Sequence, residues 1–334
     1  MALGTNFNYT YDGKLSTEVF LNPALESPEI KSLFQVRRGI RFKEQINTAG
    51  PLDRFVLADN GNCNQAPQGD KVNITNRTID MERLKYWLDQ CADDFKGNIM
   101  NEALKTGKDI NDLTGTEIDR LIQSLISQGL RNDLFRIFSF GDKNSADVNY
   151  NQMNGLWTQL IAGVATYCVT KVTNIGPTLS AGDGIVLLRE QYEKAPVELK
   201  QIPNNRKAFY VTGSVYENLL TSYESNTTGS ELQFQMLMNG GNEGSEAMPR
   251  LKFRGIDVIV YYAWDNAITS DALGNPHRIL YTTPENHIIG VAAPADSDFN
   301  AEIWFEKKEE TVNYRQRFVL GYLDLHCKLT SVSF

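Results

Sequence analysis

The clearest structural signal in the chain is the stretch from Glu117 to Phe138, which reads EIDRLIQSLISQGLRNDLFRIF. Its apolar residues recur at helical spacing, which predicts an amphipathic helix roughly 30 Å long. The preceding Thr114-Gly115-Thr116 forms a capping-box pattern with Glu117, which favours a helix start there. Gly129 interrupts the pattern and predicts a bend. The apolar face consists of Ile118, Leu121, Ile122, Leu125, Ile126, Leu130, Leu134, Ile137 and Phe138.

Upstream of this helix, residues 39–76 have the pattern of a long, polar β-hairpin. Short apolar runs at Ile40, Phe42 and 55–57 are separated by turn signals at 49–51 and 59–62, the second of which contains Asn-Gly. A hairpin this long and polar has no obvious core of its own, so we expect it to extend outward.

A first helix is expected between the hairpin and the long helix. Asp80 can cap it, and apolar residues then repeat at helical spacing. These residues are Leu84, Trp87, Leu88, Cys91 and Phe95.

Residues 1–36 are rich in Asn, Thr, Tyr, Ser and Pro, and most of their apolar side chains occur singly. Such a segment buries too little surface to fold alone. We therefore expect an arm that lies on another part of a larger assembly.

Downstream of the long helix, helices and strands alternate and then give way to long strands. Helices are expected at 153–165, 184–194 and 215–223, and strands at 167–172, 207–212, 256–262, 278–283 and 287–291. Residues 301–307 and 311–327 alternate apolar and charged side chains around Lys308-Glu309-Glu310, as half-buried antiparallel strands do. The sequence therefore predicts a mixed α+β fold.

The composition limits the classes of function. The 334 residues include 33 Lys and Arg against 41 Asp and Glu, a formal net charge of −8, and 41% are hydrophobic. This length and composition favour about two domains with a sizeable core. An acidic chain gains little from phosphate backbones, so nucleic acid would be enclosed without sequence-specific binding. We recognise no signal peptide and no apolar run of roughly 18 residues, so no membrane association is expected.

Residues that could carry catalysis are scarce. None of the three histidines, His277, His287 and His326, falls in a zinc or nucleophile motif. Residues 106–109 lack the glycine spacing of a phosphate loop, and His326 and Cys327 would point to opposite faces of a strand. We predict no catalytic residue, no cofactor-binding site and no metal site, and we expect the protein not to be an enzyme.

The four cysteines are scattered along the chain and follow no metal-ligand spacing. They are Cys63, Cys91, Cys168 and Cys327. We expect reduced thiols in a protein made in a cytoplasm.

The order of these elements resembles the major capsid protein fold shared by tailed bacteriophages and herpesviruses. Residues 118–140, Gly141-Asp142 and Asn154-Gly155-Leu156 are similar to the family's spine helix and the connection that follows it. Residues 209–219 resemble a strand–helix unit of the family's axial domain. Residues 254–258 resemble a strand of the family, and residues 314–322 resemble its closing strands.

The resemblance implies a domain organisation. It places an N-terminal arm at 1–36, an extended β-hairpin loop at 37–77, and an α/β axial domain at 151–294. A peripheral domain with the spine helix would comprise 78–150 and the C-terminal strands at 295–334. Only a short arm precedes the loop, so scaffolding would come from a separate protein, or the sequence is a processed form.

The implied function is that of a major capsid protein. Such a subunit self-assembles as hexamers and pentamers into an icosahedral shell that encloses double-stranded phage DNA. The implied partners are other copies, portal and scaffolding proteins and, as a further option, decoration proteins. The implied location is the virion, after assembly in the host cytoplasm. The alternative is another virion structural protein such as a tail-tube subunit, which would be mostly β and lack the long helix.

Within the hairpin loop we predict contacts between subunits. The cluster of Arg37, Arg38, Arg41 and Lys43 could touch nucleic acid, but the acidic composition favours salt bridges to an acidic neighbouring subunit. The apolar residues expected to be buried against that neighbour are Phe42, Phe55, Val56 and Leu57.

Overall fold

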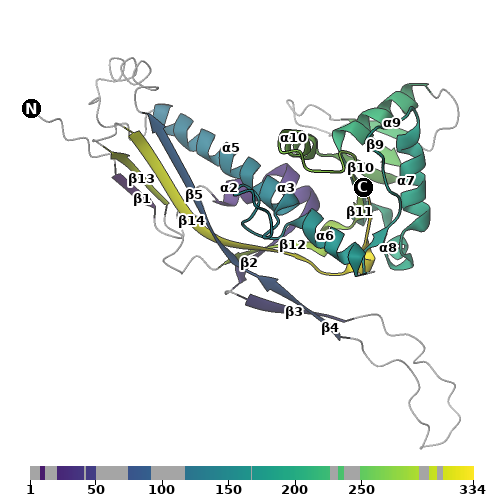
Figure 1. Cartoon of the computed structure of the whole chain (residues 1–334), viewed down its shortest axis with the longest axis horizontal. Coiled ribbons are helices and arrows are strands. Elements are labelled where there is room, and N and C mark those ends of the chain that lie inside the picture. The colour runs from purple at the N-terminus through teal and green to yellow at the C-terminus, as the bar shows by residue number, and fades with distance from the viewer. Residues whose placement is uncertain are drawn as a thin grey trace, which may run out of the picture.

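The computed structural model describes residues 8–11, 21–40, 43–49, 74–91, 117–166, 168–225, 232–236, 249–292, 301–306 and 311–334. Figure 1 shows an elongated molecule with three parts. Long strands and a long helix occupy one end, a sheet with helices occupies the other, and a two-stranded ribbon projects between them. The predicted α+β fold is confirmed.

The first sheet is organised around one long strand and is called the long-strand sheet below. Its strands are β1 (Asn8–Tyr11), β2 (Gln35–Ile40), β5 (Glu82–Cys91), β12 (His287–Ala292), β13 (Ala301–Glu306) and β14 (Thr311–Asp324). Strand β14 pairs with β13 and β12 along one edge and with β5 along the other. The predicted alternation in β14 holds over residues 314–318, where Tyr314, Gln316 and Phe318 are buried and Arg317 is exposed, but it fails on both sides of this stretch, since Asn313 and Val319 are also buried.

The helix predicted after Asp80 is wrong, because residues 82–91 form strand β5. Leu84, Tyr86 and Leu88 also fit a spacing of two, and their side chains pack with the core. Ten consecutive residues of β5 pair with β14, and this ladder overrides the local helical spacing. Phe95, the last residue of the predicted helix, lies outside the described residues.

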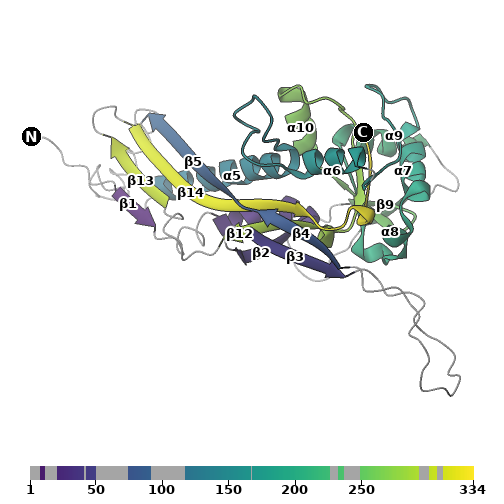
Figure 2. The same cartoon turned by 60° about the horizontal axis from the view of Figure 1, so that its bottom comes forward.

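The long helix is confirmed as α5 (Glu117–Phe140), about 36 Å long at 1.5 Å per residue. It runs beside β5 and β14 in both views (Figures 1 and 2). From its predicted apolar face, Ile126, Leu130 and Leu134 are almost fully buried. The helix is continuous through Gly129, where an added Cβ would come within 2.9 Å of the Tyr86 hydroxyl. Gly129 thus leaves room for Tyr86 of β5.

Part of the predicted arm belongs to the chain's own core. Leu21, which precedes helix α2 (Asn22–Leu25), Leu25 of α2, and Ile30 and Leu33 of α3 (Pro28–Leu33) are 0% exposed and belong to the same cluster as residues of α5. The expectation that this segment lies elsewhere in an assembly is therefore wrong for residues 21–34. The Ser27 side chain accepts a hydrogen bond from the Ile30 amide and caps α3.

The second sheet has seven strands and is called the seven-stranded sheet. They are β6 (Thr170–Lys171), β7 (Ala208–Val211), β8 (Leu232–Met236), β9 (Pro249–Phe253), β10 (Ile256–Val260), β11 (Ile279–Thr282) and β15 (Thr330–Ser333). Alternate residues of β7 join different cores: Phe209 and Val211 belong to one cluster, and Tyr210 belongs to the cluster that contains α5. The β9–β10 turn places Arg254 and Gly255 at φ 50° and 79°, as a two-residue hairpin loop requires.

The remaining helices lie around the seven-stranded sheet or between the two sheets. They are α6 (Leu156–Ala165), α7 (Asp183–Lys194), α8 (Val197–Gln201), α9 (Gly213–Ser225) and α10 (Tyr262–Ser270), with the short η3 (Asn204–Arg206), η4 (Pro284–Asn286) and η6 (Cys327–Leu329). The predicted helices 153–165, 184–194 and 215–223 are confirmed as α6, α7 and α9. No described helix is both long and apolar enough to cross a bilayer.

The two sheets do not divide at the predicted domain boundaries. Strand β12 falls in the range predicted as axial but pairs with β14, and β15 falls in the C-terminal range but pairs with β11 and β6. The chain therefore passes from one sheet to the other more than once, so several chain segments connect the two sheets.

Candidate assembly surfaces

The projecting ribbon is a β-hairpin whose base the structure describes. Strands β3 (Lys43–Ala49) and β4 (Ile74–Asp80) pair antiparallel in seven consecutive positions. Figures 1 and 2 both show this ribbon leaving the body of the molecule. The predicted hairpin is thus confirmed at its base, whereas the predicted turn at 59–62 lies outside the described residues.

The root of the hairpin rests on two glycines that lie opposite each other on neighbouring strands. Gly290 of β12 pairs with Gly321 of β14. A Cβ at Gly290 would come within 2.6 Å of Ile79 Cδ1, and one at Gly321 within 2.5 Å of the Asp80 carbonyl oxygen. Because neither glycine has a side chain, β4 can lie directly against β12 and β14, and this pair of glycines is called the glycine seat below. Ile40 is buried in the same small cluster as Ile79.

The basic residues at this root are neutralised inside the chain. Arg37 pairs with Glu44 at 2.6 Å, Arg38 with Glu26 at 3.1 Å, and Lys43 with Asp80 at 3.1 Å, all with partly exposed side chains. The predicted salt bridges to a neighbour are not needed to balance these three cations. The other predicted contact residues, Arg41, Phe42, Phe55, Val56 and Leu57, lie outside the described residues.

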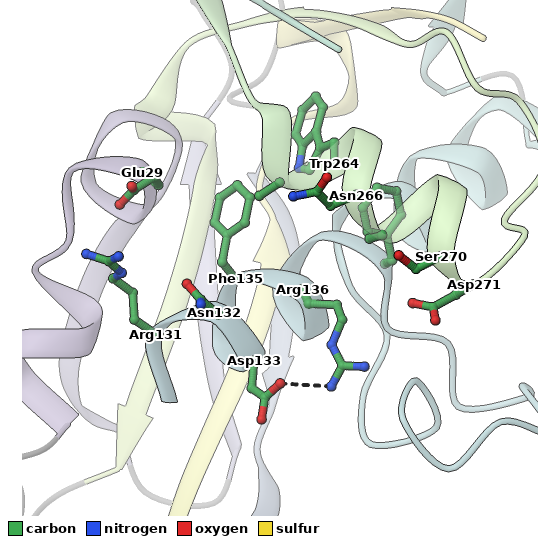
Figure 3. A pocket seen from close by; sticks show the side chains of 13 residues that line it. Glu29, Arg131, Asn132, Asp133, Phe135, Arg136, Trp264, Asn266, Ser270 and Asp271 are labelled. Atoms are coloured by element: carbon green, nitrogen blue, oxygen red, sulfur yellow. Dashed lines mark hydrogen bonds and ion pairs between the residues drawn. The ribbon is translucent and has the colours of Figure 1, made fainter. Parts of the chain in front are cut away.

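A pocket of about 350 Å³ opens between α3, α5 and α10. Figure 3 shows its charged rim, where Arg136 pairs with Asp133, and Arg131 lies toward Glu29. Asp271 at the end of α10 accepts a hydrogen bond from the Tyr150 hydroxyl. Charges of both signs balance one another here, so the pocket fits a polar contact surface better than a site for a charged substrate.

A serine–histidine pair lies at the start of α9, and the sequence motifs do not indicate it. Ser214 Oγ is 2.7 Å from His277 Nδ1, and His277 Nε2 lies 3.1 Å from the Pro177 carbonyl oxygen. The amides of Gly213 and Ser214 both donate to the Asp265 carboxylate. Because Asp265 occupies the donors that an oxyanion would need, the arrangement serves as a helix cap.

Metal chemistry finds no support in the part of the chain that the structure describes. No group of three His, Cys, Asp or Glu side chains there could hold a metal ion. The stretch 106–109, which superficially resembles a phosphate loop, lies outside the described residues.

A buried polar network lies where β14 leaves the long-strand sheet. Asp324 accepts a hydrogen bond from Asn286 Nδ2 at 2.7 Å, and its carboxylate lies 3.5 Å from His287 Nδ1. The two ring nitrogens of His287 are within hydrogen-bond distance of Tyr322 and Thr282 hydroxyls. Burial raises the pKa of Asp324 to about 7, although Arg77 opposes this rise, and burial lowers the pKa of His287 to about 3. Each group is therefore held in its neutral form near pH 6.

The expectation of four reduced cysteines is wrong for two of them. Cys168, just after α6, and Cys327, at the start of η6, form a disulfide with a Cα–Cα distance of 5.4 Å. They are 159 residues apart in sequence, so only the packing of α6 beside the end of β14 brings them together. Cys63 lies outside the described residues.

Comparison with known proteins gives a result at the level of structure. No protein-family model and no curated protein sequence matches the chain. A chain of the satellite phage P4 procapsid, a structure that includes the size determination (Sid) protein, matches with a TM-score of 0.57 and 10% identity, over 95% of this chain and 98% of that one. Chains of Gordonia phage Cozz and Mycobacterium phage Cain match with TM-scores of 0.51 and 0.50 and identities of 13% and 14%. Both matches cover 90% of this chain; they cover 84% of the Gordonia phage Cozz chain and 87% of the Mycobacterium phage Cain chain.

The chain has the tailed-phage major capsid fold. Because the identities are 10–14%, the likeness lies in topology and not in shared side chains. The order of elements, which carried the predicted resemblance, is therefore confirmed. The tail-tube alternative is not favoured, since it required a mostly β chain without a helix such as α5.

Proposed function

We propose that this protein is the major capsid protein of a tailed bacteriophage, which self-assembles into an icosahedral shell around double-stranded DNA. The observation that carries the proposal is the match to the satellite phage P4 procapsid, which covers nearly the full length of both chains. On this proposal the subunits form hexamers and pentamers, are assembled in the host cytoplasm and reside in the virion. Portal and scaffolding proteins would be partners, with decoration proteins as a further option.

The proposed domains follow the two sheets. The long-strand sheet and α5 form a peripheral domain, and the seven-stranded sheet with its helices forms an axial domain. Relative to the boundaries 78–150, 151–294 and 295–334, β12 moves to the peripheral domain and β15 to the axial one.

The hairpin supplies the proposed contact between subunits. Its root is anchored by the glycine seat, and residues 50–73 between β3 and β4 include the apolar Phe55, Val56 and Leu57. An apolar segment on a projecting ribbon gains most by being buried against another molecule. Each contact can be weak, because many contacts engaged together in a closed shell give large avidity.

The test is to replace Phe55 with Asp and to examine the protein by negative-stain electron microscopy and size-exclusion chromatography at rising concentration. We expect a folded subunit that no longer forms shells or rings. Val197→Asp is a matched control, since Val197 is 64% exposed on α8, far along the chain from the hairpin. Normal shells from the Phe55 variant would contradict the hairpin contact. A wild-type chain that forms long tubes would instead favour a tail protein.

A further inference from the structure

The pairing of β5 with β14 creates a basic face on the long-strand sheet. Leu84 and Tyr86 pack with the core, so the alternate residues Arg83, Lys85 and Trp87 lie on the opposite face. The register places Lys85 directly opposite Arg317 of β14. These residues are 232 positions apart in sequence (317 − 85), and the pattern of charges along the chain does not reveal their proximity.

Two of these cations lack a carboxylate partner within the described chain. Arg315, on the same strand as Arg317, pairs with Glu302. At the hairpin root, the described cations Arg37, Arg38 and Lys43 are also paired. Neither Lys85 nor Arg317 has such a partner among the described residues, and Lys85 instead lies 3.8 Å from the centre of the Trp87 ring. Like charges directly opposite on neighbouring strands destabilise a sheet. An anion from outside the chain would remove this repulsion.

The surface between the two cations is hollowed. A depression of about 210 Å³ is lined by Arg83, Leu84, Lys85, Arg317, Phe318 and Val319. Trp87, 57% exposed, lies beside it and donates a hydrogen bond to Asn313. Trp and Arg are enriched at the centres of protein interfaces, whereas binding to a phosphate backbone depends on many cations. Two cations that have no carboxylate partner among the described residues, beside a tryptophan, therefore favour a protein partner.

We propose that this depression, the Lys85–Arg317 site, receives the carboxylate of an Asp or Glu side chain from a second copy of the chain. Charge complementarity supports that occupant, because each copy carries a net charge of −8. One carboxylate can accept charge-assisted hydrogen bonds from an arginine and a lysine that face each other, and its negative charge offsets the repulsion between them. The inference rests on the proposed shell function, which supplies many copies at close range, and it adds a contact separate from the hairpin.

The first test is the double variant Lys85→Gln/Arg317→Gln. We expect the protein concentration needed for assembly at low salt to rise at least about tenfold, with a smaller rise at high salt, where screening already weakens the contact. The matched control is Arg206→Gln/Lys328→Gln, because those exposed cations already pair with Glu285 and Glu198 inside the chain. The thermal unfolding temperature of the isolated double variant should stay unchanged or rise slightly. A merely structural role for the two cations would lower it.

The second test identifies the contact directly. Assembled particles from a mixture of isotope-labelled and unlabelled wild-type protein are treated with a zero-length carbodiimide, which joins an amine to a nearby carboxylate. Mass spectrometry should find Lys85 joined to an Asp or Glu of another copy, and this product should be absent from the control peptide around Lys328.

Three results would overturn the proposal. Normal assembly of the double variant, with no cross-link from Lys85 between copies, would remove the contact but leave the proposed shell function standing. Normal assembly combined with weakened binding to a short DNA duplex would assign the site to nucleic acid. A wild-type chain that forms no particles and no cross-link from Lys85 would remove the proposed function and the contact together.

Discussion

The buried pair of Asp324 and His287 predicts an unusual dependence of stability on pH. Burial raises the pKa of Asp324 from 3.8 to about 7 and lowers that of His287 from 6.5 to about 3. Between about pH 4 and 6.5 the folded state therefore holds one proton, on Asp324. The unfolded state also holds one, on His287. Since the proton counts are equal, the pair adds no slope to the wild-type free energy of unfolding in this range.

Replacing either residue should reveal how the remaining one makes the free energy of unfolding depend on pH. In Asp324→Asn, the remaining His287 is neutral when folded but charged when unfolded, so the unfolded state binds the extra proton. The free energy of unfolding should then fall by about 1.4 kcal/mol for each pH unit of acidification between about pH 6.5 and 4, relative to wild type. In His287→Gln, folded Asp324 keeps a proton that the unfolded chain loses. Stability should then fall by a similar amount for each unit as pH rises from about 4 to 7.

The assay is urea unfolding of the isolated subunit at half-unit steps between about pH 5 and 6.5, followed by tryptophan fluorescence. Trp157 and Trp264 are almost fully buried, so unfolding will change their emission. Each variant is compared with wild type at the same pH, because all other titrating groups then cancel. The two difference slopes should have opposite signs.

Slopes of the same sign in both variants would refute this reasoning, as would two flat differences. Flat differences would mean that the remaining group in each variant binds its proton equally in the folded and unfolded states, so that burial does not shift its pKa. The result depends on slopes and not on absolute stability, so the hydrogen bonds lost by each substitution do not obscure it.

Two further predictions concern the seat of the hairpin and the disulfide. Gly321→Val should lower the free energy of unfolding by about 1–3 kcal/mol and displace the hairpin root, because its Cβ alone would lie 2.5 Å from the Asp80 carbonyl oxygen. Gly274→Val, whose Cβ would meet nothing within 4 Å, is the control, and equal losses in the two variants would contradict the close approach. The double variant Cys168→Ser/Cys327→Ser should unfold about 2–4 kcal/mol more easily than the oxidised wild type and become insensitive to reductant. A wild type whose denaturation is unaffected by reductant would show that this disulfide does not form in solution.

The elements that the sequence predicts correctly are those whose pattern is local and unambiguous. In α5, four apolar residues for every two turns leave no alternative to an amphipathic helix. In β14, the alternation over residues 314–318 fits a half-buried strand. The resemblance to the capsid fold rested on the order of arm, hairpin, long helix, mixed central region and C-terminal strands, in which α5 and β14 are the clearest elements.

Strand β5 shows where local pattern is insufficient. Leu84, Leu88 and Cys91 fit a helical period, while Leu84, Tyr86 and Leu88 fit a period of two. Both patterns are present in the same ten residues, and only the ladder with β14, more than 200 positions downstream, selects the strand. The N-terminal helices were missed for a related reason, since their few apolar residues form a core only when α5 lies against them.

The chain's own sequence determined the α+β class, the long helix, the projecting hairpin and the acidic charge, because each depends on neighbouring residues or on composition. Tertiary structure alone decided which charges are neutralised, which cysteines meet and which titrating groups are buried. Arg37 and Arg38 stand out in the sequence yet have partners within the chain, whereas Lys85 and Arg317 become a basic site only through the register of two strands. Coulomb energy, bond formation and desolvation depend on distance in space, and that distance is set by strand pairing and packing rather than by position along the chain.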